Sequence, residues 1–328
     1  MNYNESKELF NHLFSGDMSS QEMRNLLLQI KLDEDTPYEV IAGAAEVMRA
    51  HSIALPISQE LQDKAIDVVG TGGDKIGSFN ISSTVSILLA SCGCFVAKHG
   101  SRSVTSKSGS ADMFEALGVH LDLEINKSAR LLEETGFTFM FAQNHHPAMK
   151  FIMPVRKTIA DKTIFNILGP LTNPAKVKKS LLGVFDKSFV PKIAKALELN
   201  GATSTIVVSS KEHMDEISIS DITYASELKN GMSKDFIIDP QEYGIKKAPL
   251  SAIMGGDAHA NAKILYNIFE KNATDAQRDI VLLNAAAALI VEGMARDFQD
   301  GLEIAREAIA SGAPMKKLKQ IMEVSNKL

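Results

Sequence analysis

A glycine-rich turn follows the first short apolar run of the chain. Gly70, Gly72 and Gly73 stand within four positions after residues 65–69, and Asp74 comes next. Glycine lets the backbone bend sharply, expose its N–H groups and approach a ligand closely. The spacing is neither the Gly-x-Gly-x-x-Gly dinucleotide fingerprint nor a P-loop ending in Gly-Lys-Ser/Thr. The turn therefore indicates a phosphate contact, and an ordinary strand-to-helix turn is the alternative.

Residues 75–111 contain cations but no Asp or Glu, in a chain whose formal net charge is −5. This stretch predicts a locally positive surface. A helix is expected to begin within it, where hydroxyl groups and free backbone donors would meet the positive end of the helix dipole. The residues at that helix start are Asn80, Ser82, Ser83 and Thr84. An N-cap with nothing bound is the alternative.

A second apolar run, residues 95–97, also ends in polar residues. It leads into Lys98, His99, Gly100, Ser101 and Arg102, and then into a Ser- and Gly-rich turn over residues 106–110. Ligands of open α/β sheets bind at the carboxyl ends of the strands. Two such strand ends predict a pocket for more than one phosphate.

Two adjacent carboxylates, Asp215 and Glu216, follow a later apolar run at residues 205–208. Carboxylates beside a polyphosphate pocket are the oxygen ligands that Mg²⁺ uses. Neighbouring side chains of a regular strand point to opposite faces, so both can serve only if the backbone is irregular or if each meets a different ion. Solvated surface acids are the alternative.

Histidine and arginine residues stand in a Pro-rich segment, residues 145–179. His145 and His146 are adjacent, but no third metal ligand follows at helical spacing, which favours structural or hydrogen-bonding roles. Arg156 can hold a substrate carboxylate through two parallel hydrogen bonds, and a solvated arginine is the alternative.

The elements that must position these residues form two units. Residues 1–64 have helical periodicity, including a capping box at Ser19 and Glu22. Apolar runs separated by helical stretches then predict a mostly parallel sheet covered on both faces. These runs are 65–69, 95–97, 137–141, 181–185 and 205–208. We expect a small helical domain, 1–64, to which 151–178 returns, and an α/β domain made of 65–150 and 179–328.

Composition and charge exclude several classes of protein. With 328 residues, 45% of them hydrophobic, the chain is globular, and its net charge of −5 argues against nucleic-acid binding. No apolar run approaches the roughly 20 residues of a membrane helix, and the N-terminus lacks the pattern of a secretory signal. Cys92 and Cys94, the only cysteines, suit buried thiols in a reducing compartment better than a redox pair. We therefore expect a soluble cytoplasmic protein.

Seven stretches together resemble the anthranilate phosphoribosyltransferase family. They are GTGGD (70–74), FNISS (79–83), KHGSRSVTSKSGSAD (98–112), HHPAM (145–149), PVR (154–156), TIFNILGPLTNPA (163–175) and Asp215-Glu216. The resemblance spans about residues 65–220. It implies a helical domain plus an α/β domain of the nucleoside phosphorylase/phosphoribosyltransferase type. It also implies transfer of phosphoribose from phosphoribosyl diphosphate (PRPP) to the amino group of anthranilate in tryptophan biosynthesis.

The same resemblance assigns site residues. PRPP would contact Gly70, Gly73, Asp74, Ser78, Asn80, Ile81, Ser82, Ser83, Lys98, His99, Gly100, Arg102, Ser106 and Ser110. Anthranilate would contact Gly70, Ser101, His146, Arg156, Gly169 and Pro170. Mg²⁺ would be held by Ser82, Asp215 and Glu216, and the catalytic residues would be Lys98, Arg156 and His99, the last as a candidate general base. A homodimer and an association with an anthranilate synthase component are further expectations.

The chain departs from the family pattern at Ser101, where Asn is usual, and at Ser78 and Ser83, where Thr is usual. The two changes from Thr keep the hydroxyl group, whereas Ser101 lacks an amide that both donates and accepts beside the aromatic substrate. Two alternatives stay open. One is a pyrimidine nucleoside phosphorylase or another phosphoribosyl transfer on the same scaffold, and the other is an inactive relative that binds nucleic acid.

Overall fold

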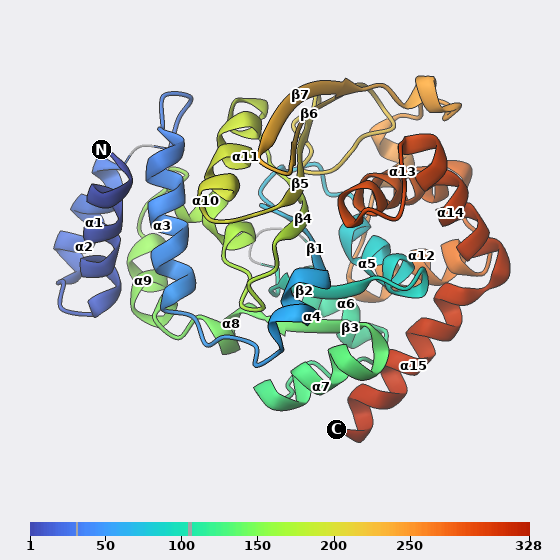
Figure 1. The fold of residues 1–328 in the computed structure, drawn as a ribbon, viewed down its shortest axis with the longest axis horizontal. Helices are drawn as coiled ribbons and strands as arrows, with labels where there is room; N and C mark the ends of the chain where they lie inside the picture. The colour runs from blue at the N-terminus through green and yellow to red at the C-terminus, as the bar shows by residue number, and fades with distance from the viewer. Residues whose placement is uncertain (31, 104–106) are drawn as a thin grey trace.

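A seven-stranded sheet forms the centre of the molecule (Figure 1). The computed structural model describes residues 1–30, 32–103 and 107–328. The strands are β1 (Ala65–Gly70), β2 (Phe95–Gly100), β3 (Phe137–Phe141), β4 (Lys179–Gly183), β5 (Ser204–Ser210), β6 (Thr223–Lys229) and β7 (Met232–Ile238). Their order is β3-β2-β1-β4-β5-β6-β7, with the first five parallel and the last two antiparallel. The predicted mostly parallel α/β sheet is confirmed.

The antiparallel hairpin of β6 and β7 was not predicted. Its turn is Asn230-Gly231, with φ of 51° and 75°. This dipeptide favours a two-residue hairpin turn because both residues tolerate positive φ. The side chains of β7 are mostly exposed, so the apolar alternation of a half-buried strand is missing from its sequence.

Four helices precede the sheet. They are α1 (Tyr3–Ser15), α2 (Ser20–Gln29), α3 (Tyr38–Ala50) and α4 (Gln59–Lys64). The predicted capping box is present at α2, where Ser19 accepts a hydrogen bond from Glu22 N and the Glu22 carboxylate accepts one from Ser19 N. The apolar faces of α1 and α3 pack on each other, which leaves the remaining apolar surface to be covered by a later part of the chain.

That cover comes from the segment after β3. It contains α8 (Ala142–His145), α9 (Met149–Arg156), α10 (Phe165–Leu168) and the 3₁₀ turn Gly169–Leu171. Helix α9 packs on α2 and α10 on α3, and the Phe165 ring meets those of Phe10 and Phe14 edge-on. The same apolar cluster continues into β4, β5 and α11 (Val190–Leu199). The division into two domains stays a prediction, because the helices share this core with one side of the sheet.

Six of the remaining described helices lie on the other side of the sheet, in or against the largest apolar cluster (Figure 1). They are α5 (Ile81–Ser91), α6 (Ser110–Ala116), α12 (Ala258–Phe269), α13 (Asp275–Glu292), α14 (Phe298–Ser311) and α15 (Ala313–Lys327). Helix α7 (Ile125–Thr135) instead packs on Ala97 and Met140, which point away from that side. Further 3₁₀ turns lie at Lys187–Phe189, Pro240–Tyr243 and Leu250–Ile253. The buried helices α5 and α13 pack on each other within the largest apolar cluster. Both cysteines are free thiols. Among the described residues, no helix is long and apolar enough to cross a membrane.

Candidate active site

The strand order reverses between β1 and β4. From β1 the chain adds β2 and β3 on one side, and β4 and β5 then continue on the other. The two central strands run parallel, with their last residues, Gly70 and Gly183, paired in register. Connections leave such a point in opposite directions, so a crevice forms outside the carboxyl ends of these strands.

The glycine-rich turn leaves β1 at this crevice. Gly72, Gly73 and Gly77 have φ of 66°, 74° and 78°, values that side chains with a Cβ rarely adopt. Thr71 N donates to the Gly183 carbonyl at 3.0 Å, which ties the turn to β4. The predicted bend is therefore present, and it links the end of β1 to the end of β4.

Asp215 closes over the ends of both strands. Gly72 N donates to its Oδ2 at 2.6 Å. A Cβ added at Gly70 would lie 2.2 Å from that oxygen, and one added at Gly183 would lie 1.6 Å from the Asp215 carbonyl oxygen. Glycine is thus required at both strand ends. Gly183 was missed in the sequence because it lies inside the apolar run 181–185, which was expected to continue as a strand, whereas β4 ends at Gly183.

The predicted magnesium ligands lie together. Ser82 N, in the first turn of α5, donates to Glu216 Oε1 at 3.1 Å, and Asp215 precedes Glu216 in a segment outside any strand. The irregular backbone that two adjacent carboxylates require is present. Lys98, which is 1% exposed, donates from Nζ to Ser82 Oγ at 3.3 Å and to the Val68 carbonyl. Lys98 is therefore a buried cation next to Ser82, one of the predicted magnesium ligands.

Negative charge exceeds positive charge at this point. Burial raises the pKa of Asp215 and of Glu216, and the neighbouring carboxylates of Asp74 and Asp215, respectively, raise them further. Burial also lowers the pKa of the Lys98 ammonium group, against the opposing effect of the nearby acids. Buried carboxylates in such excess fit a divalent cation. Among the described residues, no three His, Cys, Asp or Glu side chains are arranged to hold a metal by themselves. Substrate oxygens and water would have to complete the ligand shell.

The second strand end lies beside the first. Gly100 ends β2, and a Cβ there would lie 2.3 Å from Ser110 Oγ, at the start of α6. Asn80, at the N-cap position of α5, makes no side-chain cap and instead exchanges two hydrogen bonds of 3.3 Å with Ser108. Asn261 Nδ2 also donates to Asn80 Oδ1 at 2.7 Å. The loops after β1 and β2 are therefore joined through Asn80 and Ser108, and the pocket for more than one phosphate stays a prediction.

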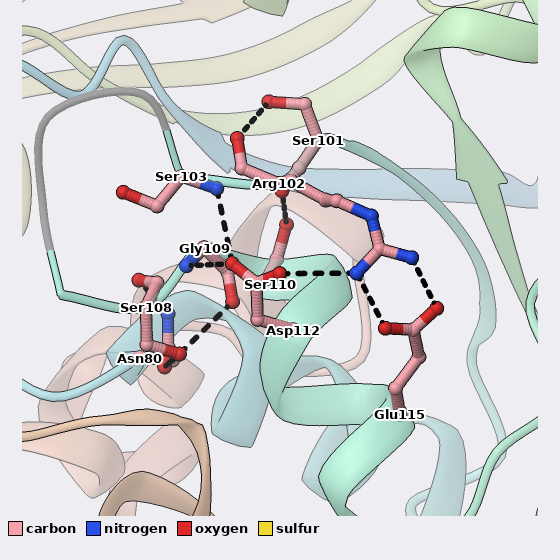
Figure 2. Close-up of polar contacts among 9 residues, drawn as sticks. All are labelled: Asn80, Ser101, Arg102, Ser103, Ser108, Gly109, Ser110, Asp112 and Glu115. Carbon is pink, nitrogen blue, oxygen red and sulfur yellow. Dashed lines mark hydrogen bonds and ion pairs between the residues drawn. The ribbon is translucent and has the colours of Figure 1, made fainter.

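Other residues assigned to PRPP hold this framework in different ways. Ser78 pairs with Met254 in an isolated bridge, Ile81 is a buried apolar side chain, and Ser83 Oγ is buried with no hydrogen-bond partner among the described residues. The Arg102 guanidinium group pairs with the Asp112 and Glu115 carboxylates of α6 (Figure 2). Acids that begin at residue 112 thus neutralise part of the positive stretch. Ser106 lies outside the described residues.

His99 and His146 form a buried pair beside the Gly169–Leu171 turn. Their ring centroids are 5.1 Å apart. Burial lowers the pKa of His99 well below its ordinary value and that of His146 to about 4. Both rings are therefore neutral near pH 7, and His99 is a weak base. Nε2 of each ring is buried with no hydrogen-bond partner among the described residues.

Three other residues assigned to this part of the site differ in their surroundings. Pro170 is buried next to Gly169, and Ser101 Oγ donates to the Arg102 carbonyl at 3.1 Å. Arg156, at the end of α9, is half-buried, and its Nη1 donates a hydrogen bond to Met153 Sδ at 4.0 Å. Burial lowers the pKa of its guanidinium group. Within the described ranges, no ion pair or hydrogen bond links Arg156 to the other predicted site residues. By contrast, His145 has a structural role, because its Nδ1 donates to the Ile53 carbonyl at 2.7 Å.

Two residues missed in the sequence join the strands beneath the site. Asp67, buried in β1, accepts hydrogen bonds from His99 N at 3.2 Å and from Asn173 Nδ2 at 2.7 Å. The same Asn173 amide donates to the Ala97 carbonyl at 2.9 Å. Burial raises the pKa of Asp67 to about 6. An acid inside an apolar run is a signal that could have identified it, because an unpartnered buried carboxylate is costly.

Comparison with known proteins agrees with this geometry. A family model described as "Glycosyl transferase family, a/b domain" matches residues 62–315. The anthranilate phosphoribosyltransferase of Rhodopseudomonas palustris is 43% identical over 321 residues, which cover 98% of this chain and 93% of that protein. The anthranilate phosphoribosyltransferase of Xanthobacter autotrophicus is 42% identical over 324 residues, covering 99% and 92%.

Solved structures are similar over the same length. The anthranilate phosphoribosyltransferase of Thermus thermophilus matches with a TM-score of 0.92 and 34% identity, covering 99% of this chain and 96% of that one. The Saccharomyces cerevisiae enzyme in complex with PRPP and Mg matches with a TM-score of 0.86 and 27% identity, covering 98% and 94%. A structure of that yeast enzyme in complex with 4-fluoroanthranilate has a TM-score of 0.85 and 26% identity, covering 98% and 94%. The chain therefore belongs to the anthranilate phosphoribosyltransferase family.

Proposed function

We propose that this protein transfers the phosphoribosyl group of PRPP to the amino group of anthranilate in tryptophan biosynthesis. In this reaction the bond from C1 of the ribose to pyrophosphate breaks, a bond from C1 to the amine nitrogen forms, and the amine loses a proton. One observation carries the proposal: the glycine-rich turn, Ser82 and the carboxylates of Asp215 and Glu216 meet where the strand order reverses. The PRPP and Mg found in the yeast relative support the same assignment.

PRPP is proposed to lie against the joined loops after β1 and β2. Backbone N–H groups of the turn from Gly70 to Asp74 and the start of α5 suit phosphate oxygens. Ser82, Asp215 and Glu216 would hold Mg²⁺, which when bound supplies positive charge against the negative charge that grows on departing pyrophosphate. The buried Lys98 ammonium group adds a fixed positive charge behind these groups, where preorganised electrostatics is most effective.

Anthranilate is proposed to lie toward the His99, His146 and Gly169 cluster, with its carboxylate facing Arg156. An aryl amine is a weak nucleophile, so orientation must supply much of the rate. The neutral imidazole rings can orient the amine through Nε2, which has no protein partner among the described residues. Their lowered pKa values make proton abstraction by His99 a minor contribution. Ser101 would contribute a hydroxyl group in place of the family's usual amide.

The assembly and location of the protein stay proposals. The helical segment formed by α1–α3, α9 and α10 carries exposed apolar side chains at Leu28 and Phe151, which suit the proposed homodimer. An association with an anthranilate synthase component and a cytoplasmic location follow from the family's biosynthetic role. Sedimentation of the purified protein tests the dimer directly.

The activity is tested by mixing the protein with PRPP, anthranilate and Mg²⁺ and following the loss of anthranilate fluorescence. Omitting PRPP or Mg²⁺ should abolish the loss. Glu216→Gln should lower kcat/KM by roughly 10²-fold or more, because it removes a charge from the site. The matched control is Glu212→Gln on the same segment, whose carboxylate accepts a hydrogen bond from Ser218 Oγ instead, and it should stay within about twofold of wild type. Phosphorolysis of a pyrimidine nucleoside without use of anthranilate would overturn the proposal.

A further inference from the structure

A single carboxylate joins the two ends of the loop that links β2 to α6 (Figure 2). Asp112 Oδ2 accepts hydrogen bonds from Gly109 N at 2.8 Å and from Ser103 N at 3.0 Å. Its other oxygen, Oδ1, accepts one from Arg102 Nη1 at 3.2 Å. Three donors from both sides of the loop therefore converge on one side chain.

The Gly109 bond alone would be the reciprocal half of a helix capping box. The Ser103 bond is not, because Ser103 lies nine residues before Asp112, at the opposite end of the loop. The two ends are pressed together, since a Cβ added at Gly109 would lie 2.4 Å from Ser103 N. Asp112 thus fixes where the loop leaves β2 and where it enters α6.

This closure sets the position of polar groups assigned to PRPP. Ser108, directly before Gly109, exchanges two hydrogen bonds with Asn80, and Ser110 Oγ donates to the Ser101 carbonyl at 3.4 Å. The hydroxyl groups of Ser108 and Ser110 are thereby held between the end of β2 and the start of α5. A carboxylate that accepts backbone N–H bonds makes charge-assisted contacts, which are stronger than neutral ones.

We propose that Asp112 is a positioning residue for PRPP, which acts through the loop ends without touching the substrate. The proposal rests on the proposed function. Affinity for PRPP is the property it controls, because displaced loop ends would no longer present Ser108, Ser110 and Asn80 together. The aromatic substrate and the chemical step depend on other groups.

Glu115 supplies a matched control on the same helix. It pairs with Arg102 through two bonds of 2.5 and 2.6 Å but accepts no backbone N–H group from the residues that the structure describes. Its side chain is 41% exposed, against 24% for Asp112, and exposed ion pairs contribute little to stability. Glu115→Gln therefore removes a charge and a partner of Arg102 while leaving the loop ends joined.

The experiment measures KM for each substrate and kcat for wild type, Asp112→Ala, Asp112→Asn and Glu115→Gln. Asp112→Ala should raise KM for PRPP at least about tenfold, with KM for anthranilate and kcat within about threefold. Asp112→Asn should raise KM for PRPP less than Asp112→Ala does, with the other two constants within about threefold of wild type. Its amide oxygen can accept both N–H groups that Oδ2 accepts, but it is uncharged and its amide nitrogen faces Arg102 Nη1. Glu115→Gln should match wild type within about twofold.

A second readout does not depend on catalysis. Trypsin cleaves after Lys107, an exposed residue of this loop, and mass spectrometry reports the rate at that bond. Asp112→Ala should speed this cleavage at least about fivefold, whereas Glu115→Gln should not. The proposal is overturned if Asp112→Ala leaves KM for PRPP and the cleavage rate unchanged, or if Asp112→Asn fails as Asp112→Ala does. Should Asp112→Ala not fold, the Asn and Gln variants decide alone. Wild-type protein that consumes no anthranilate would instead refute the proposed function, and the cleavage rates would still report on the loop.

Discussion

Replacing Gly183 by Ala tests whether the last residues of the two central strands, β1 and β4, must lack a Cβ so that Asp215 can pack against them. The added Cβ would lie 1.6 Å from the Asp215 carbonyl oxygen, whereas ordinary contact begins at 3.4 Å. The obstacle is main chain, so the segment carrying Asp215 and Glu216 must move by about 2 Å in a closely packed region. Overpacking of this kind costs about 3 kcal/mol, which lowers the Tm of a chain of this length by roughly 4 °C. Displaced carboxylates should lower kcat/KM by at least about 10²-fold.

Gly70→Ala provides the matched comparison, because its Cβ would meet Asp215 at a side-chain oxygen, 2.2 Å away. Asp215→Ala removes that oxygen but keeps the main-chain carbonyl group. In a calorimetric double-mutant cycle, the Tm loss caused by Gly70→Ala should therefore shrink to about 1 °C or less in the Asp215→Ala background. The loss caused by Gly183→Ala should persist there in full.

Two results would refute this reasoning. One is a Gly183→Ala protein with the Tm and the activity of wild type, which would show that the segment adjusts freely. The other is equal rescue of both glycine variants by Asp215→Ala, which would show that the carboxylate, and not the main chain, is the obstacle at both positions.

Three further changes have defined outcomes. His146 has a pKa of about 4 in the folded protein against an ordinary 6.5, so the unfolded chain binds more protons as pH falls below 6.5. This histidine alone should lower the free energy of unfolding by about 2 kcal/mol between pH 7 and pH 5. Urea unfolding at the two pH values should therefore show a change for His146→Gln that lacks this contribution, and an identical change in wild type and variant contradicts the prediction. Arg156→Ala should raise KM for anthranilate roughly 10–100-fold and leave KM for PRPP unchanged, because a charged hydrogen bond to the substrate carboxylate is lost. Initial rates measured over a range of both substrate concentrations check this prediction. An unchanged KM for anthranilate contradicts it. Lys98→Met should lower kcat by roughly 10²–10³-fold, measured under saturating substrates, and full turnover would show that this ammonium group has no part in the reaction.

The five parallel strands could be predicted because each is an apolar run that continues into turn residues. Strands that are buried on both faces do not alternate apolar with polar residues, so the length of the apolar run and the turn residues that flank it indicate the strand. The hairpin of β6 and β7 lacks this pattern, since most side chains of β7 are exposed, and only the Asn230-Gly231 turn marks it. Local composition therefore identifies the buried strands, including the edge strand β3, better than the exposed hairpin at the opposite edge.

The site divides in the same way. Gly72, Gly73 and the Asp215-Glu216 pair have residue types that suit phosphate and Mg²⁺, and the structure brings the two groups together. The need for glycine at position 183 depends on where the Asp215 carbonyl group lies, which no local pattern contains. The pairing of Arg102 with Glu115 was likewise missed, because absence of acids within residues 75–111 says nothing about acids one helical turn beyond.

Burial decides the roles of Lys98 and His99 more than residue type does. As a sequence, Lys98-His99 at a strand end indicates an exposed cation and a base. In the fold both side chains are almost completely covered, with Lys98 held by main chain and Ser82 and with the His99 ring neutral. Solvent exclusion of this degree is a property of the packed sheet, so it could not be inferred from two adjacent residues.

The position of Gly183 and Asp215 also determines when the site comes into existence during synthesis. The bend after β1 leaves the ribosome early, but its partners on β4 and on the acidic segment follow more than a hundred residues later. Until then the edge of β1 that pairs with β4 is exposed, and the glycine-rich turn lacks the Asp215 carboxylate that accepts its Gly72 N–H group. A ribosome-bound chain that stops before residue 215 should therefore be unable to retain the sugar donor, and any chaperone that binds the growing polypeptide has this uncovered central strand as its target.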